Sequence, residues 1–150
     1  MIIHFICRGN SFRSIIAEAY LNSLKIDDLT ATSSGTVGAV NKAKNLPYYR
    51  MTLDLLDRHG IGKYAKDGYG EQLTQPFLEQ AGMAICMNRV VYDECLRLVS
   101  FPVGPRVWSV TDIGEPGRIG RTEAESMRYR EEAYQEIVRN VDRLISPGPA

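Results

Sequence analysis

Short apolar runs alternate with longer helical patterns along the whole chain. A continuous apolar run is typical of a strand buried on both faces, and apolar residues that recur every three or four positions are typical of a packed helix. The predicted strands are residues 1–6, 29–34, 83–87 and 106–110. The predicted helices are residues 14–24, 48–58, 76–80, 89–98 and 123–144. This alternation predicts an α/β fold, with a parallel sheet, right-handed crossovers and helices on both faces.

Length and composition predict one globular domain over residues 1–150. Apolar residues make up 44% of the chain and charged residues 24%, a balance unlike that of disordered proteins. Eighteen basic residues balance eighteen acidic ones, so net charge favours neither nucleic acid nor a membrane surface as partner. The first apolar run is too short to span a membrane and has no basic leader.

The three cysteines are Cys7, Cys86 and Cys95. Their odd number and the absence of a C-x-x-C pattern argue against a disulfide-rich secreted fold and against a structural zinc site. We therefore expect a cytoplasmic protein, in a compartment where a free thiol can act as a nucleophile.

The turn after the first predicted strand reads CRGNSFRS, from Cys7 to Ser14, and a helix follows directly. Backbone N–H groups in such a turn can point at one anion, and the helix dipole adds about half a positive charge. A cysteine at the start of this turn lies in the same positive field, which favours its thiolate. Arg13 returns to the mouth of the turn, where its planar guanidinium can bind two phosphate oxygens. The turn therefore predicts a phosphate-binding loop in which Cys7 is a nucleophile.

The other loop residues are predicted to support this site. Asn10 tolerates left-handed backbone and is expected to fix the shape of the loop. The Ser14 hydroxyl can donate to the sulfur or cap the following helix. The predicted substrate-binding residues are Arg8, Gly9, Asn10, Ser11, Phe12 and Ser14. A buried strand-end cysteine beside a surface arginine is the alternative without catalysis, but it does not explain this combination of residues in a strand-to-helix turn.

The loop after the fourth predicted strand carries a candidate acid, Asp112. Ligands of such sheets bind at the carboxyl ends of the strands, so Asp112 is expected at the same sheet edge as Cys7. A positioned carboxylic acid that protonates a leaving group typically supplies about 10²–10⁴ in rate. Glu115 and Asp93 are weaker candidates for this role. An aspartate that only stabilises its own loop is the alternative.

Together these residues resemble the signature of the low molecular weight protein tyrosine phosphatase family. The matching segments are Cys7-x5-Arg13-Ser14 with Gly9-Asn10 inside, Ala17-Glu18, Ser34-Gly35-Thr36, Gln72-Leu73-Thr74 and Trp108-x3-Asp112. The resemblance implies a four-stranded parallel sheet, a cysteinyl-phosphate intermediate, and no metal or other cofactor. It also implies Asp112 as general acid and phosphotyrosine in proteins as the default substrate. We expect the partner to be a phosphorylated protein or a small phosphate ester, and the protein to be a monomer or a weak dimer.

The sequence departs from the family pattern in three places. The family usually has proline and two tyrosines after the acid, whereas residues 113–116 here read IGEP. Residues 38–40 read GAV, where an aromatic residue usually lines the pocket. Phe12 stands in place of a second loop cysteine. The candidates for an aromatic pocket wall are Phe12, Tyr48, Tyr49 and Tyr92.

Two other functions stay open at this point. A thioredoxin-coupled arsenate reductase shares this fold and loop, but it would need Cys86 and Cys95 to pass a disulfide outward from Cys7. Eight residues separate these two cysteines, a wider spacing than in that branch, and Cys86 lies in a predicted buried strand. The non-enzymatic alternative is an inactive phospho-anion-binding module, although binding alone would not need the sulfur.

Overall fold

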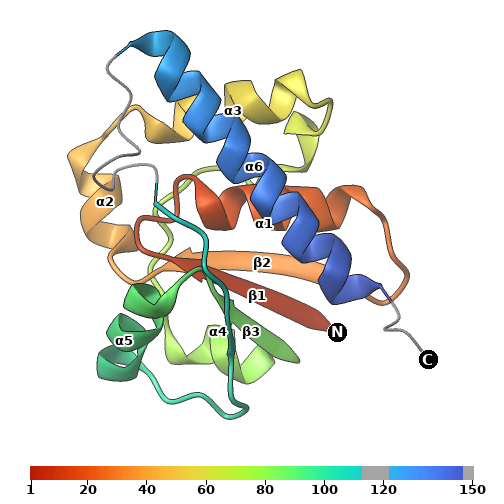
Figure 1. Ribbon diagram of the computed structural model, residues 1–150. Coiled ribbons are helices and arrows are strands. Elements are labelled where there is room, and N and C mark those ends of the chain that lie inside the picture. The colour runs from red at the N-terminus through yellow and green to blue at the C-terminus, as the bar shows by residue number, and fades with distance from the viewer. Residues whose placement is uncertain (113–121, 147–150) are drawn as a thin grey trace.

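The computed structural model describes residues 1–112 and 122–146. Its centre is a parallel sheet with the strand order β2-β1-β3-β4 (Figure 1). The strands are β1 (Ile2–Cys7), β2 (Thr30–Gly35), β3 (Met83–Cys86) and β4 (Arg106–Val107). The predicted single α/β domain with a four-stranded parallel sheet is confirmed.

Helices cover both faces of this sheet, as predicted. One face carries α1 (Arg13–Ser23), α3 (Tyr48–Arg58) and α6 (Glu123–Ile145). The other carries α4 (Gln75–Gln80) and α5 (Arg89–Leu98). Two further elements are α2 (Gly38–Lys44), after β2, and the 3-10 helix η1 (Gly62–Tyr64), after α3. Among the helices that the structure describes, none is long and apolar enough to cross a membrane.

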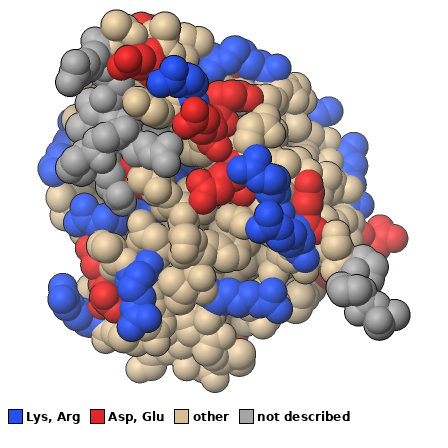
Figure 2. Space-filling model, in the orientation of Figure 1, with Lys and Arg blue, Asp and Glu red and all other residues tan. Residues whose placement is uncertain are grey.

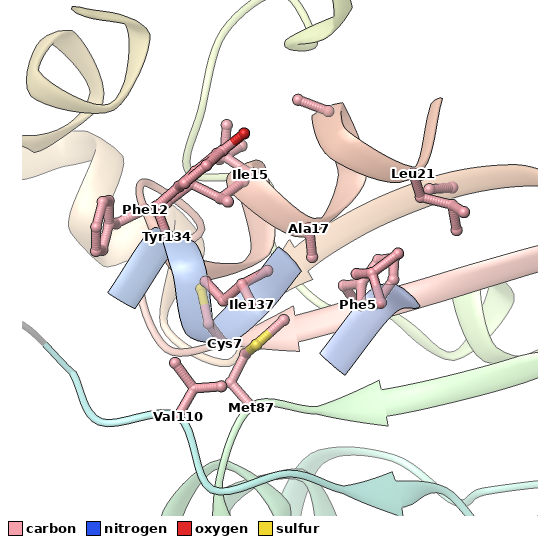
Figure 3. Close-up of a cluster of buried hydrophobic side chains, with 14 of the residues drawn as sticks. Phe5, Cys7, Phe12, Ile15, Ala17, Leu21, Met87, Val110, Tyr134 and Ile137 are labelled. Carbon is pink, nitrogen blue, oxygen red and sulfur yellow. The ribbon is translucent and has the colours of Figure 1, made fainter. Parts of the chain in front are cut away.

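The alternation of side chains along β1 assigns each residue to one of two cores. Phe5 and Cys7 lie in the larger core with residues of α1 and α6 (Figure 3). His4 and Ile6 face the opposite way, toward α4 and α5, where the His4 ring stacks on Phe77 at a centroid distance of 4.6 Å. Burial, with a smaller effect of Lys66, lowers the pKa of His4 to about 3, so this histidine is neutral in the core.

The order of the strands creates a crevice at the carboxyl end of β1. From β1 the chain crosses to β2 on one side and later to β3 on the other, so the strand order reverses at β1. In open α/β sheets, ligands bind in the crevice at such a point, outside the carboxyl ends of the strands. Cys7 pairs with Gly35 of β2 at this end. A Cβ at Gly35 would collide with the Arg8 carbonyl and lie 2.8 Å from the Asn10 nitrogen. Glycine therefore lets the loop after β1 pass directly over the end of β2.

The structure differs from the predicted elements at β4 and at α2. Predicted strand 106–110 ends at Val107, although the Trp108 and Val110 N–H groups still donate to the Cys86 and Met87 carbonyls, each at 2.8 Å. The chain thus continues beside β3 without a regular ladder. Helix α2 was not predicted, because it begins at a glycine and has no apolar stripe; only Gly38 in it is buried.

Candidate active site

A cavity of about 280 Å³ opens at the carboxyl end of β1. It is lined by Cys7, Arg8, Gly9, Ser11, Phe12, Arg13, Val37, Val40, Asn41, Lys44, Tyr48 and Asp112. The three predicted catalytic residues, Cys7, Arg13 and Asp112, therefore share one cavity although they come from three separate segments of the chain. They meet at the carboxyl edge of the sheet, where Asp112 and Cys7 were expected to lie together.

Cys7 is the last residue of β1, and its side chain is held by hydrogen bonds from the loop. Its sulfur accepts from the Asn10 backbone N–H at 3.2 Å and lies 3.0 Å from the Ser14 hydroxyl oxygen. Of the two roles considered for Ser14, the structure shows the contact with sulfur, since α1 begins at Arg13 after Phe12 and has no side-chain cap. The thiol thus lies beside the first turn of a helix, with two polar groups directed at it.

Arg13 is buried at the first position of α1, and its guanidinium reaches the segment after β4. Nη1 donates to the Val110 carbonyl at 2.9 Å, and Nη2 lies 3.5 Å from Oδ2 of Asp112. This contact places the predicted acid at the mouth of the loop. Asp93 does not line the cavity and forms an ion pair with Arg89 on the surface of α5. Glu115 and the rest of the predicted loop 113–120 lie outside the described residues.

Asn10 supports the loop from behind the cavity. Its φ of 51° is in the left-handed region predicted for it. Its Nδ2 donates to the hydroxyls of Ser14 and Ser33, at 2.9 and 3.0 Å, and its Oδ1 accepts from the Glu71 N–H at 3.0 Å. Asn10 and Ser14, two of the predicted substrate-binding residues, do not line the cavity: their side chains lie behind its wall and hold the loop in shape.

The family model for low molecular weight phosphotyrosine protein phosphatases matches residues 2–143. The chain belongs to this family. A search of curated protein sequences finds no match.

Solved structures with the same fold come from several organisms. Wzb of Vibrio vulnificus, in complex with benzylphosphonate, has a TM-score of 0.72 at 19% identity over 95% of each chain. The low molecular weight protein tyrosine phosphatase of T. tengcongensis has a TM-score of 0.67 at 21% identity over 97% of each chain. The drosophila arginine phosphatase DARP has a TM-score of 0.68 at 21% identity over 97% of this chain and 96% of its own. At these identities the comparisons show the shared fold.

The aromatic wall of this low molecular weight phosphatase comes from two of the four predicted candidates. Phe12 and Tyr48 line the cavity. Tyr49 instead donates to the Lys66 carbonyl at 2.6 Å, and Tyr92 stacks on Phe101 at 6.0 Å. Val40 lies in the stretch 38–40, where the family usually has an aromatic pocket residue, and it lines the cavity. Asn41 and Lys44 were not expected there, because no periodic apolar pattern marks residues 38–44 as a helix.

A buried carboxyl group, Glu18, lies behind the loop and was given no role from the sequence. The Ser33 hydroxyl, which accepts from Asn10, donates to Glu18 Oε2 at 2.9 Å. Lys66 donates to the Ser33 carbonyl at 2.9 Å. Burial raises the pKa of Glu18 to about 7, against the lowering effects of Lys66 and of the Ser33 hydrogen bond. A chain of hydrogen bonds therefore connects Glu18 through Ser33, Asn10 and Ser14 to the sulfur.

Glu18→Gln is expected to change how stability depends on pH. The pKa of Glu18 is about 7 in the folded chain, against an ordinary value of 4.5 that applies to the unfolded chain. As the pH rises between these two values, the unfolded chain loses this proton first, so the folded state loses stability relative to it. The glutamine variant has no such proton to lose. Its free energy of unfolding, relative to that of wild type, should therefore rise by on the order of 3 kcal/mol between pH 4 and pH 8. Urea unfolding at both pH values measures the difference.

Glu79→Gln, on the exposed surface of α4, is the matched control and should follow the wild-type curve. If the free energies of unfolding of wild type and Glu18→Gln changed with pH in the same way, the raised pKa of Glu18 would be contradicted.

The other two thiols lie on the opposite face of the sheet from Cys7. Cys86 is adjacent to Ile6 in the sheet register, and it packs with Cys95 of α5 in the smaller core, both fully buried. Hydrogen bonding to Cys86, together with burial, raises the pKa of the Cys95 thiol. These two cysteines therefore form a buried pair with the sheet between them and the cavity.

Proposed function

We propose that this chain hydrolyses phosphate monoesters, with phosphotyrosine in proteins as substrate, through a cysteinyl-phosphate intermediate. The observation that carries the proposal is the common cavity of Cys7, Arg13 and Asp112, at a loop in which the Asn10 backbone N–H donates to the sulfur. Family membership supports the same reaction. All three cysteines are free, which fits a protein acting in the reducing cytoplasm.

The proposed mechanism has two displacement steps at phosphorus. In the first, the Cys7 thiolate forms the S–P bond while the P–O bond to the leaving group breaks and Asp112 protonates the departing oxygen. In the second, Asp112 takes a proton from water, whose oxygen attacks phosphorus and releases inorganic phosphate and the thiolate. Arg13 and the backbone N–H groups of residues 8–13 hold the three equatorial oxygens in both steps.

The walls of the cavity favour an aromatic phosphate ester. Tyr48 contributes an exposed ring and Val40 an aliphatic surface, and Phe12, which also lines the cavity, is almost wholly buried in the larger core. Aromatic rings stack or pack edge to face with a gain of about 0.5–1.5 kcal/mol per pair beyond the buried area. A phosphotyrosine side chain can place its phosphate in the loop and its ring between these residues. Phosphoserine has no ring to fill that space.

A substrate panel tests the proposal. The purified protein is assayed with an aryl phosphate and with peptides carrying phosphotyrosine, phosphoserine or phosphoarginine, the last because a similar structure is an arginine phosphatase. We expect turnover of the aryl phosphate and the highest kcat/KM with the phosphotyrosine peptide. Binding of phosphate without any turnover would favour the inactive module. A preference for phosphoarginine would reject the proposed substrate.

The position of Cys86 and Cys95 argues against the arsenate reductase. A disulfide relay needs each thiol to attack the next sulfur, which requires contact and thiolate character. Here the pair is buried on the far side of the sheet, and the pKa of Cys95 is raised.

Replacing Cys86 and Cys95 together with alanine should leave phosphatase kcat/KM nearly unchanged, because neither thiol lines the cavity. The measurement is aryl phosphate hydrolysis by wild type and the double variant, with melting temperatures to correct for lost packing. In parallel, wild type is incubated with arsenate, thioredoxin and its reductase. Consumption of arsenate that disappears in the double variant would reinstate the reductase.

A further inference from the structure

One wall of the cavity is built by α2, whose role the sequence did not indicate. Lys44 follows Val40 by four positions and Asn41 by three, so its side chain lies on the same side of this helix as theirs, and all three residues line the cavity. The side chain of Lys44 therefore belongs to the surface that a bound substrate meets outside the phosphate loop.

The helix is attached to the loop that binds the phosphate. Asn41 Nδ2 donates to the Gly9 carbonyl at 3.1 Å, and the Val37 N–H donates to the Arg8 carbonyl at 2.9 Å. On its other side, the Ala39 N–H donates to Oε1 of Gln72 at 3.1 Å. These bonds set the position of Lys44 relative to the nucleophile, so its charge acts at a defined place on the rim.

The other cations of the cavity have acidic partners. Arg8 Nε forms an ion pair with Glu94 of α5 at 2.9 Å, and Arg13 lies against Asp112. Within the described ranges of the chain, Lys44 forms no ion pair. Basic and acidic side chains are interspersed over the face seen in Figure 2, in line with the net charge of zero.

We propose that Lys44 is a specificity-determining residue that selects phosphotyrosine sites flanked by a glutamate or aspartate. This inference rests on the proposed phosphatase function. The phosphate group itself is matched by the loop and Arg13, so the charge at the rim is available for a neighbouring carboxylate of the peptide. An exposed ion pair of this kind changes affinity by about 1.5- to 5-fold and weakens with salt.

The test uses phosphotyrosine peptides that differ only in Glu or Gln beside the phosphotyrosine, placed before it in one pair and after it in another. For each pair we measure the ratio of kcat/KM values, Glu over Gln, at low and high salt. Wild type should prefer Glu by about 1.5- to 5-fold in at least one pair at low salt, with the preference reduced at high salt. Lys44→Gln should bring the ratio close to one, and Lys44→Glu should invert it.

Lys42→Gln is the matched control, because Lys42 is exposed on the same helix but does not line the cavity. It should keep the wild-type ratio. A wild-type ratio of one in both pairs, or an equal loss in Lys42→Gln and Lys44→Gln, would overturn the role of Lys44. Turnover of a plain aryl phosphate by wild type distinguishes failure of the proposed function from failure of this inference. No turnover would reject the phosphatase function, whereas turnover without a preference for acidic peptides would reject only the role of Lys44.

Discussion

Replacing Cys7 with serine is expected to abolish hydrolysis of phosphate esters and to leave oxyanion binding measurable. A serine hydroxyl at this position lacks a neighbouring general base and is a much weaker nucleophile than a thiolate, so kcat should fall by a factor on the order of 10⁴ or more. The backbone N–H groups and Arg13 are unchanged and still surround an anion. Aryl phosphate kinetics measure the first effect, and calorimetric titration with inorganic phosphate measures the second.

Cys7→Ala serves as a second variant, since it removes even the weak hydroxyl nucleophile. Both variants should unfold at a temperature close to that of wild type, which shows that the loss is chemical. Retained hydrolysis in Cys7→Ala would rule out the sulfur as nucleophile. Loss of phosphate binding in a folded Cys7→Ser protein would instead show that the loop depends on the sulfur for its shape.

Asp112→Asn is expected to slow substrates according to how poor their leaving group is. A phenol is a poor leaving group unless it is protonated as it departs, and a positioned acid contributes about 10²–10⁴ in rate. The first step for phenyl phosphate should therefore slow by about this factor, whereas that for an activated nitrophenyl ester should slow much less. Single-turnover kinetics across a series of substituted phenyl phosphates give the dependence of rate on leaving group.

Asp93→Asn, on the surface of α5, is the control and should leave the whole series unchanged. Asp112 also faces Arg13, so its loss can alter phosphate binding. Separate values of kcat and KM distinguish this effect from acid catalysis. Equal slowing of every ester in the series would remove Asp112 from the role of general acid and leave it as a partner of the arginine.

Much of the fold could be predicted because its signals are local. The apolar run before Cys7 and the periodic pattern after Ser14 define a strand, a turn and a helix within about two dozen residues. In α5 the predicted bounds, residues 89–98, agree with the structure. The left-handed backbone of Asn10 also follows from its residue type. Where spacing along the chain determines geometry, the sequence was sufficient.

Other features depend on pairing between distant segments. The side of the sheet on which Cys86 lies follows from its register with Ile6, and this separates it from Cys7. The burial of Glu18 requires Ser33 and Lys66, which arrive from β2 and from the segment after η1. The length of β4 likewise depends on pairing with β3, because regular pairing ends at Val107 and residues 108–110 keep only separate hydrogen bonds to the end of β3 and to Met87.

The sequence alone indicated the loop from Cys7 to Ser14, its arginine and the parallel α/β architecture, because each is encoded by neighbouring residues. The cavity residues of α2, Asn41 and Lys44, are brought to the site by tertiary contacts. Helix α2 has no apolar stripe and is held through hydrogen bonds to Gly9 and Gln72, so the wall that carries Lys44 exists only once the loop and the sheet have come together. Contacts of this kind join residues about 30 positions apart, beyond the reach of any local pattern.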